Sequence, residues 1–131
     1  MNAPTRIDLD RTIPDVAYGF GLPNVADMKS FLEGVAGLAH TRVVAAGFRG
    51  TTAGLSDQLD DAFDFMVIER CAEDNDCEPG VPLTRARKAV FAIDYEGGAT
   101  LQFACSSWAN KMFDGILKQD PPAGNFRMGC P

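Results

Sequence analysis

The chain has 131 residues, 46% of them apolar, and a formal net charge of −6. This length suits a single domain, residues 1–131, and the apolar content excludes general disorder. The sequence starts without a recognisable secretory signal and has no apolar run near the roughly 18–20 residues that cross a bilayer, so it predicts a cytoplasmic protein with no membrane partner.

The negative charge is concentrated in an acidic band, residues 57–78. Nine of the 18 Asp and Glu residues lie there with one basic residue, Arg70, which gives 1 − 9 = −8. The remaining nine acidic and eleven basic residues give 11 − 9 = +2 elsewhere. A basic strip, Arg85, Arg87 and Lys88, follows the band closely. Opposite charges side by side on a small sheet favour a binding surface.

Residues 1–23 are predicted to form an N-terminal arm. Ile7 and Leu9 alternate with aspartates, which indicates a short edge strand, before prolines and glycines interrupt the pattern. A helix is predicted over 25–40, because apolar residues recur on one face at spacings of three and four and Asn24 can cap its start.

Two strands and a short helical turn are expected next. The strands are predicted over 42–48 and 63–71, and Ser56 can cap a turn over 57–61. The loop 72–84 is long for a hairpin connection, and long loops are often functional.

Alternating apolar residues then predict a β-hairpin with strands 89–94 and 101–105. A three-residue loop at 96–98 would place Ile93 opposite Leu101, so that apolar side chains share a face. The expected fold so far therefore depends on antiparallel pairing.

A second helix is predicted over 108–118. The tail 123–131 adds an edge strand around 126–128 or stays loose. The whole pattern predicts an α+β fold, an antiparallel sheet of four to five strands with two packed helices, and an OB-like, partly open barrel is one form of it.

The four cysteines are Cys71, Cys77, Cys105 and Cys130. Their spacing lacks the short paired knuckles of structural zinc sites, and a cytoplasmic protein keeps its thiols reduced. The favoured interpretation is that the cysteines are thiols, with Cys71 and Cys105 as small buried residues. A metal site and a Cys71–Cys77 disulfide, which needs an oxidising setting, are the alternatives.

Catalytic signals are weak. The chain has no nucleophile elbow, phosphate loop or dinucleotide fingerprint, and its one histidine, His40, is expected at a helix end. Asp60 and Asp61 are expected to face solvent. The run 74–78 resembles the start of a calcium loop, but Pro79 stands where that turn needs glycine. The sequence therefore predicts a non-enzymatic protein without a cofactor or metal.

Aromatic residues on the predicted strands are typical of single-stranded nucleic-acid binders, which stack bases on a sheet and place cations beside the phosphates. A single phenylalanine is more often a core residue, and the sequence pI of about 4.6 opposes this function. The candidate nucleic-acid-binding residues are Arg42, Arg49, Arg70, Arg85, Arg87, Lys88 and Tyr95.

The acidic band supports an alternative function of nearly equal standing. Closely spaced carboxylates can imitate the phosphates of a nucleic acid and dock on a basic surface of a host protein, as an inhibitor would. A solvated face is the simpler explanation. The candidate protein-binding residues are Asp57, Asp60, Asp61, Asp64, Glu73, Asp74, Asp76 and Glu78.

The order of features from Ser56 onward resembles small phage and mobile-element proteins of the single-stranded-DNA-binding type. The features are Ser56-Asp57-Gln58-Leu59, 64–70, 89–94, Glu96-Gly97-Gly98, Leu101-Gln102-Phe103 and Ser106-Ser107. The resemblance implies an OB-like barrel and an accessory protein that binds single-stranded nucleic acid through its sheet, with a homodimer left open.

Overall fold

The computed structural model describes residues 5–8, 25–50, 55–122 and 124–131. Its strands form one six-stranded sheet in the order β1-β2-β3-β4-β5-β6. The strands are β1 (Thr5–Asp8), β2 (Ala46–Arg49), β3 (Phe65–Glu69), β4 (Ala89–Tyr95), β5 (Asp114–Lys118) and β6 (Met128–Gly129). Apart from 5–8, the expected N-terminal arm lies outside the described residues.

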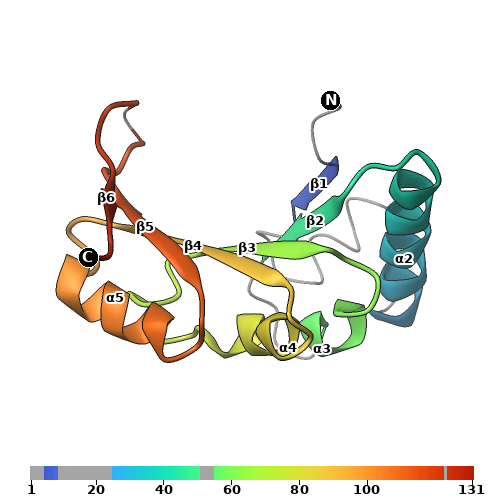
Figure 1. The fold of residues 1–131 in the computed structure, drawn as a ribbon, viewed down its shortest axis with the longest axis horizontal. Coiled ribbons are helices and arrows are strands. Elements are labelled where there is room, and N and C mark those ends of the chain that lie inside the picture. The colour runs from blue at the N-terminus through green and yellow to red at the C-terminus, as the bar shows by residue number, and fades with distance from the viewer. Residues whose placement is uncertain (1–4, 9–24, 51–54, 123) are drawn as a thin grey trace.

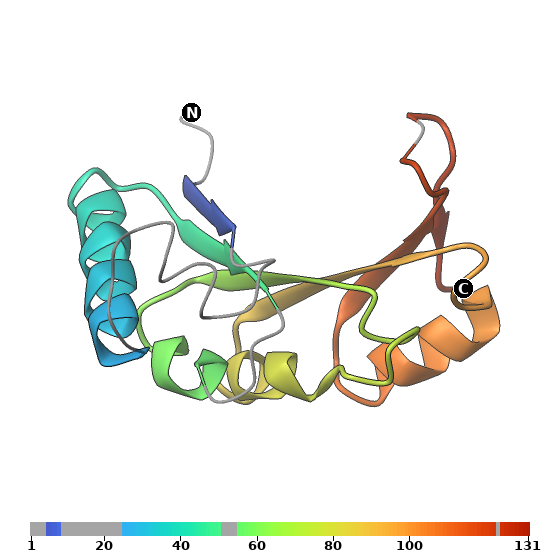
Figure 2. The same ribbon diagram turned by 180° about the vertical axis from the view of Figure 1, so that it is seen from behind.

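Helical segments connect these strands. They are α2 (Val25–Thr41), α3 (Ser56–Leu59), the 3-10 turn η1 (Glu78–Gly80), α4 (Val81–Arg85) and α5 (Leu101–Ala109). In Figure 1, α3, α4 and α5 line one face of the sheet, and α2 stands beside the end that carries β2. Figure 2 shows from behind that the sheet curves away from this helical layer.

The core lies between the sheet and the helices. In β3, Met66 and Ile68 are buried while Phe65, Val67 and Glu69 are half-buried. This alternation turns one face of the strand to the helical layer, where apolar burial stabilises the fold. Trp108 from α5 is buried in this core. The opposite, concave face carries the half-buried set.

The predicted antiparallel, OB-like sheet is wrong. The strands β1 to β5 all pair in parallel, and only β5 and β6 pair antiparallel. Parallel neighbours need a crossover connection, usually helical, and α2, α3, α4 and α5 lie in the four connections between these strands.

The predicted hairpin and second helix are also wrong. Residues 101–109 form α5. Thr100 caps the start of this helix, because its hydroxyl accepts a hydrogen bond from the Phe103 N–H at 3.2 Å. Residues 114–118 form β5, which pairs with β4 in parallel. The apolar alternation at Leu101 therefore belonged to a helix with one buried face.

Other elements match more closely. The helix expected over 25–40 is confirmed as α2, and the strand expected over 63–71 as the shorter β3. Strand β2 begins four residues later than the expected 42, and the expected loop 72–84 contains η1 and most of α4. The helical turn begins at Ser56, but the Ser56 side chain does not cap it, since Leu55 holds the cap position.

The cysteines form two disulfides, Cys71–Cys77 and Cys105–Cys130. The favoured expectation of four thiols is therefore wrong, and the Cys71–Cys77 alternative is the one the structure has. Within the described ranges, no group of three or more His, Cys, Asp or Glu side chains is arranged to hold a metal ion. No helix in this part of the chain is long and apolar enough to cross a membrane.

Candidate functional site

Charged side chains gather at the carboxyl ends of the parallel strands. Because these strands run in one direction, residues that end β2, β3 and β4 meet at one edge of the sheet, where α/β folds bind ligands. We call this group the carboxyl-end cluster. Its members are Arg49, Glu69, Arg70, Glu73, Tyr95 and Asp120.

Arg49 and Glu69 form the part of the cluster that lies on the concave face. Arg49 Nη2 and Glu69 Oε2 are 2.5 Å apart, and the two side chains are 14% and 19% exposed. Each residue ends its strand one position after a buried residue, Phe48 or Ile68, so both point away from the helical layer. The pair is a partly desolvated ion pair at the strand ends.

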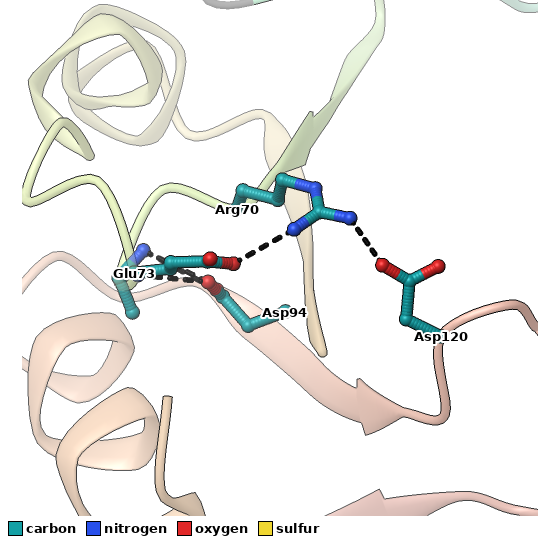
Figure 3. Close-up of polar contacts among 5 residues, drawn as sticks. Arg70, Glu73, Asp94 and Asp120 are labelled. Atoms are coloured by element: carbon teal, nitrogen blue, oxygen red, sulfur yellow. Dashed lines mark hydrogen bonds and ion pairs between the residues drawn. The ribbon is translucent and has the colours of Figure 1, made fainter. Parts of the chain in front are cut away.

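Arg70 joins two further carboxylates. Its Nη1 lies 3.0 Å from Glu73 Oε2, and its Nη2 lies 2.5 Å from Asp120 Oδ2, as Figure 3 shows. Its Cζ lies 4.8 Å from the centroid of the Tyr95 ring, within cation–π range. The hydrogen bond to Asp120 is the main reason that the pKa of Arg70 is raised; burial opposes it and Glu73 adds to it.

Asp94 is the buried carboxylate beneath this edge. It is 0% exposed and accepts hydrogen bonds from the Ala72 and Glu73 N–H groups at 3.2 and 3.0 Å and from Trp108 Nε1 at 3.1 Å. These donors come from the loop after β3 and from α5. Asp94 therefore fixes the loop that carries Glu73 to the end of β4 (Figure 3).

Tyr95 ends β4 and is 7% exposed. Burial and then the negative charge of Glu69 raise the pKa of its hydroxyl, against the opposing charges of Arg49 and Arg70. The hydroxyl therefore stays protonated at neutral pH and can donate a hydrogen bond at the cluster.

The candidate nucleic-acid-binding residues divide between the two ends of the strands. Arg49, Arg70 and Tyr95 belong to the carboxyl-end cluster. The other four, Arg42, Arg85, Arg87 and Lys88, precede β2 or β4 and so lie at the amino ends. Arg42 Nη1 donates to the Leu38 carbonyl at 3.2 Å, and Lys88 Nζ donates to the carbonyls of Asp60 and Asp61. These residues do not form one basic surface.

The candidate protein-binding residues are divided by β3 itself. Asp57, Asp60, Asp61 and Asp64 come before the strand, and Glu73, Asp74, Asp76 and Glu78 come after it. Asp64 Oδ2 accepts from the Ala46 N–H at 2.7 Å and contacts His40 Nε2 at 2.8 Å, whereas Glu78 pairs with Lys111 at 3.2 Å. The acidic band is therefore interrupted by a strand, although η1, which carries Glu78, returns to contact α3, which carries Asp57.

Glu69, Asp94 and Asp120 were not among the site residues predicted from the sequence. Glu69 is the last residue of β3, Asp94 is the last but one of β4, and Asp120 lies two residues after β5. With parallel strands these positions meet at one edge, so the signal was present, but the antiparallel prediction placed them at different ends.

Two comparisons with known proteins agree with this architecture. The model of glycoside-hydrolase family GH114 matches residues 16–130. The crystal structure of Aspergillus fumigatus Ega3 in complex with galactosamine matches with a TM-score of 0.67 at 23% identity, over 83% of this chain and 47% of that one. The chain thus spans about half the length of that structure. Comparison with curated proteins finds no match.

These matches overturn several expectations from the sequence. A match to a family of hydrolases contradicts the resemblance to single-stranded-DNA-binding phage proteins and the expectation of a non-enzymatic protein. It equally contradicts the two expected partners, single-stranded nucleic acid and a basic host protein. These expectations failed because they assumed an antiparallel, OB-like sheet that exposes aromatic side chains. The observed sheet is mostly parallel and places charged residues at the strand ends.

Proposed function

The chain belongs to glycoside-hydrolase family GH114, and we propose that its carboxyl-end cluster binds a glycan and takes part in hydrolysis of a glycosidic bond. One observation carries the proposal: charged residues ending two parallel strands, together with the loops after β3 and β5, converge at one edge. Barrel enzymes built from parallel strands place their active sites at this edge.

The chemistry needs two carboxyl groups, one that donates a proton to the leaving oxygen and one that acts as nucleophile or base. Glu69 lies 2.5 Å from Arg49, whose positive charge favours an ionised carboxylate, so Glu69 suits the role of nucleophile or base. Glu96 follows β4 and places a second carboxyl group at the same ends of the strands, and we assign it the role of proton donor. Asp120 and Glu73 then contribute charge to the substrate site.

The charge of the edge suggests the substrate class. Ega3 was crystallised with galactosamine, an amino sugar whose ammonium group is positive at neutral pH. The cluster contains the half-buried carboxylate of Glu73 and the exposed one of Asp120, and the exposed Glu96 follows β4 at the same strand ends. We infer that the substrate contains an amino sugar, which these carboxylates attract.

The test is release of reducing ends from a galactosamine oligosaccharide, with its N-acetylated form as the uncharged control. Cleavage is expected for the first substrate only. Glu69→Gln and Glu96→Gln should each lower kcat by about 10²–10⁴-fold, the usual size of an acid–base contribution. Asp57→Asn, an exposed position before β3, is the matched control. Wild-type rates in both glutamine variants would remove these residues from the mechanism.

Cellular location and domain organisation stay predictions. The sequence favours the cytoplasm and one domain, whereas two disulfides favour an oxidising compartment. Denaturation of freshly isolated protein in excess alkylating reagent, followed by mass measurement, counts the free thiols, including those at buried positions such as Cys71. Four alkylated cysteines would support the cytoplasm.

A further inference from the structure

We propose that Arg70 is a positioning residue of the glycan site, which holds Asp120 and the Tyr95 ring in place relative to Glu69. This inference rests on the proposed function. Arg70 takes no part in a chemical step and acts through the groups that it contacts, Glu73, Asp120 and the Tyr95 ring.

The backbone of Arg70 is held in an unusual conformation. Its φ of 56° lies in the left-handed region, which costs a non-glycine residue energy and persists only where the surroundings impose it. Its N–H donates to the Ile93 carbonyl at 2.8 Å, which ties it to β4. The next residue, Cys71, is buried and bound to Cys77. The chain thus turns at a fixed point and carries the Arg70 side chain to the edge.

One of the two carboxylates that Arg70 binds is itself rigid. The Glu73 N–H donates to buried Asp94 at 3.0 Å. A Cβ on Gly98 would lie 2.1 Å from Glu73 Cδ, so the Glu73 carboxylate packs directly against the Gly98 backbone. Glu73 therefore fixes the guanidinium from one side.

Asp120 is the more exposed side of the arrangement. It lies in the loop after β5, and its side chain is 47% exposed. Its carboxylate contacts Arg70 across a separation of 50 positions in the sequence. Among the described residues no other side chain binds it. The position of Asp120 thus depends on an arginine that is anchored to β4, Glu73 and the Tyr95 face.

The geometry of arginine matters here. A guanidinium presents separate N–H groups in a planar fork, so Nη1 and Nη2 can each bind one carboxylate while the plane stacks on an aromatic ring. A lysine ammonium lacks this fork. Arg70→Lys should therefore keep the charge and lose most of the positioning.

The first measurement needs no glycan. Backbone ¹⁵N relaxation of Gln119 and Asp120 is compared in the wild type, Arg70→Ala and Arg85→Ala, the last an exposed arginine at the end of α4. The order parameters should fall from about 0.85 to below about 0.6 in Arg70→Ala alone. Unchanged values in Arg70→Ala would overturn the inference whether or not the protein is a hydrolase.

The second measurement uses the galactosamine oligosaccharide. Arg70→Ala should raise KM by about 10-fold, the size of one lost charge-assisted contact, because Asp120 contributes charge to the substrate site, and kcat should change less. Added methylguanidine should recover part of the lost affinity, and Arg85→Ala should match the wild type. An unchanged KM in Arg70→Ala would overturn the positioning role. If the wild type cleaves nothing while the relaxation effect is present, the proposed function fails, and Arg70 is reduced to a structural link.

Discussion

Asp94 shows how a single side chain can connect three segments of this fold. Its carboxylate lies at the end of β4 with no exposed surface and receives hydrogen bonds from the loop after β3 and from α5. A buried carboxylate is tolerated only when donors satisfy its oxygens. Asp94 therefore organises the end of the sheet on which the proposed site lies. Its own oxygens bind N–H groups of the protein, so its role is structural.

Replacing Asp94 tests this role. Asp94→Ala leaves the N–H groups of Ala72, Glu73 and Trp108 without their acceptor, so the free energy of unfolding should fall by about 3 kcal/mol or more. Asp94→Asn keeps one acceptor oxygen and should lose less. Urea unfolding followed by fluorescence of the single tryptophan, Trp108, measures both. Asp57→Asn, at an exposed position, serves as control. If Asp94→Ala lost no more unfolding free energy than this control, Asp94 would not hold the three segments together.

Asp64 provides a pH-dependent contribution at the amino ends of the strands. Burial works to raise its pKa, but hydrogen bonds from the Ala46 N–H and from His40, with the positive charges of His40 and Lys88, outweigh burial and leave the pKa below 3.8. A lowered pKa means that the folded state binds this proton less readily than the unfolded state. Its stabilisation is therefore complete above the unfolded pKa and is lost as the pH falls through the folded value.

The expected result for Asp64→Asn follows from that sign. The variant should be less stable than the wild type at neutral pH, by about 1 kcal/mol or less because the side chain is 42% exposed. The difference should narrow as the pH falls below about 4, the ordinary aspartate pKa. Urea unfolding from pH 7 to pH 2 checks this. A constant difference over the whole range would show that the carboxylate charge is irrelevant.

At the scale of elements, the contact of α5 with β5 decides the second half of the sheet. Trp108 in α5 is buried, and a Cβ on Gly115 in β5 would lie 2.2 Å from its Cε3 atom. The absence of a side chain at Gly115 therefore lets the indole pack directly on the strand. This close approach joins α5 and β5, the two elements for which the sequence had predicted a strand over 101–105 and a helix over 108–118.

A pair of glycine variants measures that contact. Gly115→Ala should lower the free energy of unfolding by about 1–3 kcal/mol, because the methyl group overpacks the Trp108 ring. Gly34→Ala, in α2 with nothing within 4 Å of the new methyl group, should raise it by about 0.5–1 kcal/mol. Equal effects of the two substitutions in urea unfolding would contradict the close packing of α5 on β5.

At the scale of the whole molecule, the two faces of the curved sheet differ. The convex face packs on helices, and Phe63 is fully buried in that core. On the concave face Phe91 is 41% exposed, although its ring meets Phe65 edge-on at 6.0 Å. The described part of the chain thus has one well-packed apolar layer and one half-covered face above it.

The difference predicts unequal costs of removing a phenylalanine ring. Phe63→Ala should lower the free energy of unfolding by about 3–5 kcal/mol, as expected for a buried aromatic residue. Phe91→Ala should lower it by only about 1 kcal/mol, mainly through the lost ring contact with Phe65. Chemical denaturation of both variants distinguishes the faces. A loss for Phe91→Ala as large as that for Phe63→Ala would mean that the concave face is covered.

Local pattern was sufficient where one periodicity stood alone. Apolar residues at spacings of three and four, Met28 and Leu32 among them, identified α2, although Phe31 and Leu38 of the same set are exposed. An apolar run through Met66 and Ile68 identified β3. It failed around Leu101, where apolar residues two apart are compatible with both a strand and a short helix. There the Thr100 cap and the burial of Trp108 select the helix. The burial of Trp108 depends on its contact with β5, which the sequence does not show.

The sequence by itself determined the acidic composition, the presence of a helix at α2 and a strand at β3, and the presence of charged residues beside apolar runs. Only the tertiary structure decided which of those charges meet. Arg70 and Asp120 are 50 positions apart, and Arg49 and Glu69 are 20 apart. Parallel pairing brings them to one edge, and strand direction depends on the packing of connecting helices against the sheet, which no local pattern encodes.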